Sequence, residues 1–455
     1  REGTPSTTKS LKSSWSMLSF LGRLNYNYKS LYYATVSFRS DGSSKFRGDN
    51  RFGYFPSGSL AWGFMEEDFM KPLKTVVSSG KLRASWGKTG NAEIGNFASR
   101  DLWNAASYKQ LPAIEPVQPE SPNLTWEKSS QTDIGLDIGV FNNRVSGEID
   151  FYNKKTNGLL FYQNIPYTSG YSNIYRNIGD IKNTGFETVS NTQNIKKDNF
   201  TWDTNFNVAK NNNEITALPD DNRDQIIGNV IRRVGERLDS FYLVEYAGVD
   251  PNKGDALLYK NTLNPDGSLD KTKTNDYSEA QRIIAGSSTP DWIAGLTNTV
   301  EYKNFDFSFT FYGEFGGNLY NSGGKFMSTS ASNGYDNQTV DQMNRWQNPG
   351  DITNVPQARL GKGNGVEEST RYLEKNDFVR LRNLSLGYTF NKNLTSSIGV
   401  NKLRLYVSAI NVLTFTKYSG YDPEARSDTN RGGGGSTFYS APPAKTVTFG
   451  INVNF

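Results

Sequence analysis

The sequence predicts an all-β chain that forms part of the wall of a transmembrane antiparallel β-barrel, and three observations support this fold class. Apolar and polar residues alternate with period two in many segments, as in strands with one apolar and one polar face. Most of these segments run for about 9 to 12 residues, the length that crosses a bilayer at a tilt. Short and long links also alternate along the chain, as in membrane barrels.

The amino-acid composition agrees with strands that are joined by polar loops. In 455 residues the aromatic share is 13% and the hydrophobic share only 35%, with 25 Tyr and 27 Phe. Aromatic residues favour strands, whereas Asn, Ser and Gly favour turns. No run of about 18 apolar residues occurs, so the sequence predicts no transmembrane helix.

The sequence also lacks the residues that many enzymes need. It contains no Cys and no His, which excludes disulfides, thiolate metal sites, His-ligated metals and a Ser-His-Asp triad. A formal net charge of only +4 gives no basic stripe for nucleic acid. We therefore expect a protein that is not an enzyme, with no cofactor, no metal and no nucleic-acid partner.

Four segments show the period-two alternation most clearly. In the last one every second residue is apolar, namely Val447, Phe449, Ile451, Val453 and Phe455. The same pattern holds in 134–140, 305–311 and 384–390. In chain order we predict strands at 17–28, 31–40, 57–65, 81–88, 130–141, 144–153, 183–192, 200–209, 291–302, 305–313, 377–390, 402–413 and 444–455.

The links between these strands fall into two groups. Tight hairpin turns are predicted at Lys29-Ser30, Asn142-Asn143 and Lys303-Asn304. Two links, 66–79 and 391–401, are of intermediate length. The long segments, which we interpret as extracellular loops, are 41–56, 89–129, 154–182, 210–290, 314–376 and 414–443.

The number of predicted strands indicates that the wall is incomplete. About 13 strands are predicted, whereas bacterial single-chain barrels have an even number. A plugged outer-membrane transporter has about 22 strands, so residues 1–455 would be the C-terminal part, with about 13 to 14 strands. The chain opens with Arg1 rather than Met, and we interpret this start as a cut or a boundary.

A soluble β-sandwich, for example a carbohydrate-binding β protein, is the alternative explanation of the alternation. Its strands would be shorter, about 5 or 6 residues. The polar face also carries carboxylates that suit a wet lumen, at Asp133, Asp137, Glu148, Asp150 and Asp203. These two features favour the membrane barrel.

Several motifs follow one another between about Trp15 and Phe455. The segment from Leu31 to Met70 contains Asp41-Gly42-Ser43-Ser44 and Tyr54-Phe55-Pro56-Ser57. The further motifs, in order, are Lys81-Leu82-Arg83-Ala84-Ser85-Trp86-Gly87, Thr89-Gly90-Asn91, Asn123-Leu124-Thr125-Trp126-Glu127-Lys128, Asp133-Ile134-Gly135-Leu136-Asp137, Asn177-Ile178-Gly179, Asn183-Thr184-Gly185-Phe186-Glu187, Tyr302-Lys303-Asn304-Phe305-Asp306, Val379-Arg380-Leu381-Arg382-Asn383-Leu384 and Thr416-Lys417-Tyr418-Ser419-Gly420-Tyr421-Asp422-Pro423-Glu424.

In order and spacing, these motifs resemble the SusC/RagA-like family of TonB-dependent outer-membrane transporters. Val189-Ser190 departs from the alternating strand that is usual in the family, which questions the register of that strand. The resemblance implies a nutrient importer of the Bacteroidetes outer membrane, with extracellular loops and a periplasmic C-terminus. Its plug and its TonB-contacting region would lie outside this chain.

The resemblance also implies partners. Members of the family work with the TonB complex and usually with a SusD-like lipoprotein that closes over the extracellular mouth, and they commonly take up glycans or peptides. The alternating terminal strand with Phe449 and Phe455 resembles the signal that the barrel-assembly machinery recognises. A structural scaffold without transport is the competing function.

The remaining candidates are weaker. The segment 248–255 could suggest calcium but departs from the EF-hand pattern, so an Asp-rich turn is favoured. Glu66-Glu67 could suggest a glycosidase pair, and the glycine run 432–435 lacks the rest of a P-loop. Aromatic residues near turns would form an interfacial girdle, namely Tyr26, Tyr28, Tyr32 and Phe305. Loop aromatics could bind sugar or peptide or pack the loops, and no substrate site is named among Trp103, Tyr108, Tyr162, Tyr171, Tyr175, Tyr259, Tyr320 and Tyr335.

Overall fold

A computed structural model describes residues 12–328, 332, 334, 337–425 and 435–455 of the chain. Arg1, Tyr335 and residues 432–434 of the glycine run lie outside the described residues. Helices are short and few. None among the described residues is both long and apolar enough to cross a membrane.

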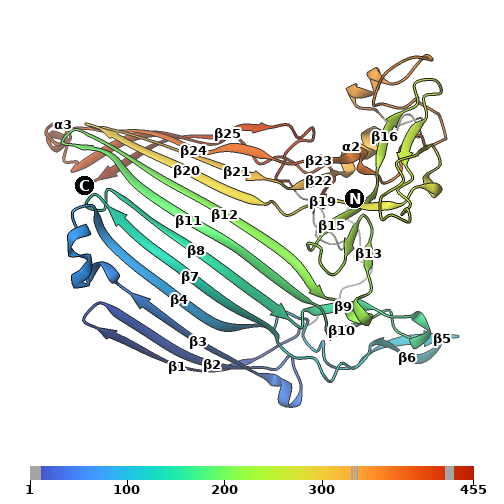
Figure 1. The fold of residues 1–455 in the computed structure, drawn as a ribbon, viewed down its shortest axis with the longest axis horizontal. Coiled ribbons are helices and arrows are strands. Elements are labelled where there is room, and N and C mark those ends of the chain that lie inside the picture. The colour runs from blue at the N-terminus through green and yellow to red at the C-terminus, as the bar shows by residue number, and fades with distance from the viewer. Residues whose placement is uncertain (1–11, 329–331, 333, 335–336, 426–434) are drawn as a thin grey trace.

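One antiparallel sheet of 13 strands dominates the structure, and its long strands lie side by side across Figure 1. All the strands predicted from the sequence are present in it, and they pair in chain order. In that order they are β1 (Met17–Tyr28), β2 (Tyr32–Ser43), β3 (Phe52–Trp62), β4 (Val77–Asn91), β7 (Glu127–Val140), β8 (Val145–Asn157), β11 (Asp180–Lys197), β12 (Phe200–Ala217), β20 (Trp292–Tyr302), β21 (Phe305–Phe315), β24 (Phe378–Thr389), β25 (Lys402–Thr416) and β27 (Thr446–Asn454).

The pairing register gives this sheet one apolar and one polar face. Residues directly opposite each other share a face, and one apolar row runs through Leu60, Ala84, Ile134, Phe151 and Phe186. The alternate row is polar, through Ser59, Ser85, Asp133 and Tyr152. In a membrane barrel the first face meets lipid and the second lines the lumen.

The predicted hairpin turns are confirmed by the backbone. Lys29 and Ser30 have φ of 52° and 57°. The second link spans 141–144, one residue longer on each side than predicted, with φ of 54°, 58° and 58° at Phe141, Asn142 and Asn143. At the third link only Lys303 has a positive φ, of 53°. Two successive residues with positive φ characterise the tight turn whose twist matches that of the paired strands. Asn tolerates this conformation better than most residues, which explains its use at the second turn.

The long loops gather at the opposite end of the strands from the short turns, and they carry small sheets of their own (Figure 1). The C-terminus lies at the end with the short turns. The loop strands are β5 (Leu102–Tyr108), β6 (Leu111–Gln118), β9 (Leu160–Asn164), β10 (Asn173–Asn177), β13 (Gln225–Ile227), β14 (Val230–Arg232), β15 (Ser240–Val244), β16 (Tyr246–Val249), β17 (Ala256–Tyr259), β18 (Lys273–Thr274), β19 (Arg282–Ser287), β22 (Asn318–Asn321), β23 (Leu373–Lys375) and β26 (Ser436–Thr437).

The helices are single turns or little more, and they lie in the links. The α-helices are α1 (Pro219–Asn222), α2 (Ser322–Met327) and α3 (Lys392–Thr395). The 3-10 helices are η1 (Gly48–Arg51), η2 (Phe64–Glu66), η3 (Asp68–Leu73), η4 (Tyr167–Ser169), η5 (Tyr277–Glu279), η6 (Val340–Asn344), η7 (Thr370–Tyr372) and η8 (Ser396–Ile398).

The start of β3 differs from the prediction, which placed it after Pro56. The strand begins at Phe52, and Pro56 pairs opposite Phe38 of β2. Pairing with β4 begins only at Ser57. Pro56 therefore lies in the part of β3 that pairs with β2 alone and is a sheet edge on its other side. An edge is the position in which a sheet accepts a residue without an N–H.

Strands β11 and β12 are 18 residues long, far longer than predicted. Their upper parts pair through polar residues such as Asn183 and Asn213, where no apolar face is needed and the alternation is therefore lost. The register at the unusual Val189-Ser190 is regular, since Val189 lies opposite Glu148 and Asn207 on the polar face.

The two outermost strands, β1 and β27, leave the sheet open. Each pairs on one side only, and no strand among the described residues pairs with their outer edges. Every residue of β1 is exposed. An edge of this length has a row of unpaired backbone N–H and C=O groups with which further strands can pair.

Candidate functional site

The sequence motifs converge at the loop end of the wall, and the first group surrounds Trp126. The rings of Phe46 and Phe55 each lie 5.5 Å from that of Trp126. The indole Nε1 of Trp126 donates a hydrogen bond to the backbone oxygen of Arg51 at 2.9 Å. A Cβ at Gly90 would come within 2.1 Å of the Phe55 ring, so the close packing requires glycine there.

The same cluster is joined to the neighbouring loop by Asn177. Its side-chain oxygen accepts from the amide of Thr125 at 2.7 Å, and its Nδ2 donates to the oxygens of Thr125 and Gly158 at 2.7 and 3.0 Å. Three motifs that are far apart in the sequence therefore pack together and hold the bases of two loops in place.

A second group of motifs forms a buried ion network. Arg380 of β24 is only 1% exposed, and its Nη2 lies 2.5 Å from Asp422 Oδ2. Its Nη1 lies 2.6 Å from Glu424 Oε2, and Arg382 pairs with the other oxygen of Glu424. The network fastens the segment 417–425 to the barrel wall.

The polar face of the wall carries further ion pairs, and Asp137 and Asp150 among them are carboxylates that the sequence predicted to face a wet lumen. Arg83 Nε donates to Asp137 Oδ1 at 2.7 Å, and its Nη2 donates to Asp150 Oδ2 at 3.1 Å. Asp306 pairs with Arg404 in the same way. Each of these arginines thus pairs with a carboxylate of another strand.

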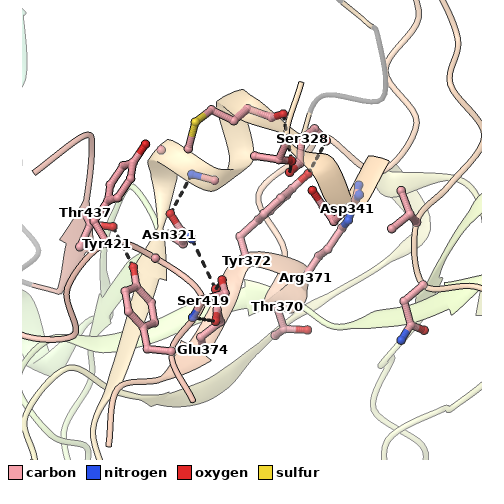
Figure 2. A pocket seen from close by; sticks show the side chains of 18 of the residues that line it. Asn321, Ser328, Asp341, Thr370, Arg371, Tyr372, Glu374, Ser419, Tyr421 and Thr437 are labelled. Atoms are coloured by element: carbon pink, nitrogen blue, oxygen red, sulfur yellow. Dashed lines mark hydrogen bonds between the residues drawn. The ribbon is translucent and has the colours of Figure 1, made fainter. Parts of the chain in front are cut away.

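A cavity of about 920 Å³ lies within the loops (Figure 2). It is lined by β16, the end of β22 with α2, the turn η7 with β23, and residues of the segments 418–425 and 437–440. Its tyrosines are Tyr246, Tyr259, Tyr372, Tyr418, Tyr421 and Tyr439. Sequence reasoning named Tyr259 as a loop aromatic but did not identify the cavity, because its walls come from three separate loops.

Hydrogen bonds hold the floor of this cavity. Glu374 accepts from the amide and the hydroxyl of Ser419 at 2.8 and 2.6 Å (Figure 2). Asn321 accepts from the amide of Gly324 at 2.7 Å. The hydroxyls of Tyr418 and Thr437 lie 3.1 Å apart. Because Asp422 adjoins this floor, the Arg380 network positions part of the cavity.

The cavity is lined by few charged side chains, and its carboxylates outnumber its single cation among the described residues, Arg371. Arg371 donates to the backbone oxygen of Gly365 at 2.9 Å and lies over the ring of Tyr372 at 5.1 Å. No carboxylate of the described residues forms an ion pair with it. Burial raises the pKa of Tyr246 to about 12, so its hydroxyl remains a donor, here to Asn354 O at 3.0 Å.

The weaker sequence candidates lie outside this cavity or have structural partners. Asp250 accepts from the amides of Asn252 and Lys253, which is the Asp-rich turn that the sequence favoured. No cluster of three potential metal-binding side chains occurs in the described part of the chain. Glu66 pairs with Lys74 at 2.9 Å, and Glu67 accepts from Trp62 Nε1 at 3.1 Å, so neither faces the loops.

The other loop aromatics divide into packed and exposed residues. Tyr320 is 1% exposed within a loop core, and the rings of Tyr162 and Tyr175 lie 4.6 Å apart. Trp103 and Tyr108 stand exposed on the β5–β6 hairpin. The sequence could not separate these roles, because burial depends on which loops meet.

Phe449 and Phe455 lie at the outer edge of the sheet. Phe449 pairs opposite Val407 on the apolar face and is 82% exposed, and Phe455 follows β27 and is 87% exposed. Both rings are accessible along the unpaired edge of β27.

Comparison with known proteins gives consistent results. The family model described as TonB dependent receptor-like, beta-barrel, matches residues 4–412. The chain is 36% identical over 463 residues to the TonB-dependent receptor P3 of Formosa agariphila, which covers 96% of this chain and 45% of that protein. It is 32% identical to the TonB-dependent receptor SusC of Bacteroides thetaiotaomicron, over 96% of this chain and 44% of that protein.

Solved structures agree with these relatives. The fold matches the RagAB peptide transporter with a TM-score of 0.87 and 31% identity, over 97% of this chain and 48% of that chain. It matches the open-open state of the RagAB peptide importer with a TM-score of 0.86. The chain therefore spans about half the length of the proteins that it matches.

Proposed function

The chain belongs to the TonB-dependent receptor β-barrel family and is SusC-like, and from this premise we propose that it supplies the wall and outer loops of a TonB-driven nutrient importer. The barrel is one of the bacterial outer membrane. The observation that carries the proposal is the two-faced sheet, with a continuous apolar row outside and ion-paired polar residues inside.

The proposed wall is completed by further strands between the open edges of β1 and β27. Residues 1–455 would then be the C-terminal part of the barrel, and the plug and TonB-contacting region would come from the rest of the protein. The unpaired edges support this arrangement, since barrels leave no edge. The loop end would face the cell exterior, and the short turns and the C-terminus the periplasm.

A SusD-like lipoprotein is the proposed partner at the loop end. The exposed β5–β6 hairpin supports it, since Trp103, Tyr108, Leu111 and Ile114 are each more than half exposed. A two-stranded hairpin is marginal alone in water, and exposed apolar rings mark contact surfaces. The imported nutrient is proposed to be an oligosaccharide or a peptide.

Phe449 and Phe455 are proposed to form the signal for the barrel-assembly machinery. Their accessible rings on an unpaired terminal strand support this role, because an open edge can pair with another strand before the barrel closes.

Growth of a deletion strain tests the importer against the structural scaffold. We expect the deletion to abolish growth on the oligosaccharide or peptide that the system imports, while growth on monosaccharides or amino acids continues. The full-length protein, extracted in detergent, should co-purify with a lipoprotein. Unchanged growth on every nutrient would favour the scaffold.

A further inference from the structure

Five lysines lie on the apolar face of the sheet, close to the loop end of adjacent strands. Along a strand, every second side chain points to the same face, and this face is marked by the row of Ala84, Ile134, Phe151 and Phe186. These five strands are neighbours in the wall (Figure 1). The lysines, which we call the lysine cluster, are Lys88 of β4, Lys128 of β7, Lys155 of β8, Lys182 of β11 and Lys210 of β12.

The register places two members of the cluster directly opposite each other. Lys155 lies opposite Lys182 across β8 and β11, and Lys88 belongs to the same row, on the far side of Ser130. The Cβ atoms of directly opposite residues are about 4.5–5.5 Å apart, and like charges in this position destabilise a sheet. An anion bound between the two ammonium groups would remove this cost.

The protein itself does not neutralise the cluster. None of the five lysines forms an ion pair with a carboxylate of the described residues, although other lysines do. Two carboxylates share the face. Asp180 already accepts hydrogen bonds from Asn157 and Gly158, and Glu214 lies at the end of the row, opposite Lys182. Five cations thus face two carboxylates, and four of the lysines are exposed.

The cluster follows directly on the apolar part of this face. On β8, Phe151 is the last apolar residue of the face, and Lys155 comes four residues later, about 14 Å farther along a strand. On β4, Nζ of Lys88 lies 5.9 Å from the ring centre of Trp86. Tryptophan is enriched where hydrocarbon meets headgroups, and a lysine near that boundary extends its ammonium group toward the headgroups. The charges of the cluster therefore lie at the level of lipid headgroups.

The cluster is confined to one side of the wall. Lys210 marks its boundary, since its Nζ lies 5.0 Å from the ring centre of Trp292 on β20. Beyond that strand, the loop end of the same face is apolar, at Phe315, Val379 and Phe415. A charge at this level is thus a feature of β4 to β12 and not of the whole wall.

We propose that the lysine cluster binds the phosphate groups of lipids in the outer leaflet of the membrane. The inference goes beyond the proposed import function and takes from it only that the apolar face meets lipid and that the loop end faces outward. A phosphate carries negative charge and acceptor oxygens, and an ammonium group offers three donors. Groups of about four to eight basic residues beside a membrane-spanning segment attract anionic lipids in the same way.

The occupant is a lipid because the cluster is continuous with the lipid-facing surface. The apolar row that contains Ile134, Phe151 and Phe186 lies next to the lysines on the same strands. Acyl chains on that row place their own headgroups beside the ammonium groups. A protein that covered the lysines would have to displace lipid from this row as well.

The test is a titration of the full-length protein, purified in a neutral detergent with the partner that accompanies it. The probe is fluorescent phosphatidic acid, whose headgroup is a bare phosphate, with fluorescent phosphatidylcholine as the comparator, and anisotropy gives both affinities. We expect phosphatidic acid to bind more tightly. The triple variant Lys128→Gln/Lys155→Gln/Lys182→Gln should weaken its binding at least tenfold, since each lysine contributes about fivefold to the attraction of an anionic lipid.

Lys109→Gln/Lys253→Gln/Lys362→Gln is the matched control, because it removes the same charge from three lysines that are exposed in the loops. It should leave the affinity unchanged. Inorganic phosphate should compete no better than chloride at the same ionic strength, because it lacks acyl chains. The proposal is overturned if phosphatidic acid binds no better than phosphatidylcholine, if both triple variants lose the same affinity, or if inorganic phosphate displaces the lipid specifically.

A single substitution tests the proposal even where the triple variant does not assemble. Lys155→Gln removes one of the two opposed charges, so it should weaken the binding of phosphatidic acid about fivefold. In vesicles of phosphatidylcholine alone it should raise the resistance of the barrel to urea, because no anion is there to offset the repulsion. A loss of stability in these neutral vesicles would mean that Lys155 serves the fold and not a lipid.

The titration and the growth assay fail independently of each other. Loss of growth in the deletion strain, together with no preference for phosphatidic acid, removes the lipid site and leaves the importer in place. Unchanged growth on every nutrient, together with a preference that the triple variant abolishes, removes the importer and supports the lipid site.

Discussion

At the scale of single residues, Arg380 shows how the fold uses charge. The guanidinium is almost wholly removed from water and contacts two carboxylates of one loop segment. Desolvating these charges is costly, so the network is not by itself a source of stability. The network instead fixes position, because Asp422 and Glu424 of the segment 417–425 both contact Arg380 of β24.

We predict that Arg380→Met releases that segment from the wall. Removing one partner of a buried ion pair costs about 3–5 kcal/mol, because the remaining charge is left uncompensated. Hydrogen exchange at the amides of 417–425 should accelerate, and Ser419 should lose its protection.

Arg404→Met is the matched control for this prediction. Arg404 pairs with Asp306, but the two side chains are 22% and 35% exposed, so its loss should cost about 1 kcal/mol or less. Exchange in 417–425 should be unaffected. Equal exchange rates in the Arg380 variant and the wild type would contradict a fastening role for Arg380.

At the scale of elements, the position of each strand is fixed by the different environments of its two faces, lipid on one side and a wet lumen on the other. In β21, Phe307, Phe309 and Phe311 lie on the apolar face, and Ser308 and Thr310 on the polar one. A slip by one residue would exchange the faces completely. The register is therefore fixed by the difference between lipid and lumen.

We predict that Phe309→Arg destabilises the barrel far more than Ser308→Arg, its neighbour on the other face. An arginine placed at the lipid-facing midplane of a barrel costs about 2–4 kcal/mol. The lumen variant should stay within about 0.5 kcal/mol of wild type, as an ordinary surface substitution does.

Urea unfolding of the two variants in lipid vesicles gives both free energies. The same loss of stability in the two variants would mean that β21 does not separate lipid from lumen in this way. A loss in the Ser308 variant alone would mean that the assignment of the faces is reversed.

At the scale of the whole molecule, the structure is a sheet with an outer edge at each side and a group of packed loops at one end of its strands. Within the described part of the chain, the outer edges of β1 and β27 are unpaired, whereas the loops pack into cores of their own, such as the one around Phe241 and Tyr320. The loops therefore have an apolar core that is separate from the wall.

We predict that Phe455→Ala slows insertion of the whole protein into the outer membrane. The ring follows the last strand and is 87% exposed, and a recognition signal acts before the barrel folds, so its loss should weaken recognition rather than the folded barrel. The folded fraction in membranes, measured by its resistance to heat and detergent, should fall.

Phe69→Ala serves as the control, since Phe69 is 65% exposed in the link between β3 and β4 rather than on the last strand. It should assemble as wild type does. Normal assembly of the Phe455 variant, or an equal defect in both variants, would remove the special role of the terminal residue.

The wall of the barrel could be predicted from the sequence because the bilayer imposes a local code. Each strand needs alternate apolar residues over a fixed length, so the pattern in 305–311 or 447–455 is sufficient by itself to predict a strand there. Beyond the apolar segment this constraint ends, and for that reason residues 210–217 of β12 and 180–182 of β11 escaped prediction.

The loop cavity could not be predicted, and the reason is again physical. Tyr246, Arg371 and Tyr421 belong to three loops with no periodic pattern, and their meeting depends on packing between distant segments. The sequence alone determined the strand order, the two faces, the tight turns and the family. Only the tertiary structure decided which loop tyrosines are buried and which line a cavity, because burial is settled by contacts that no local pattern encodes.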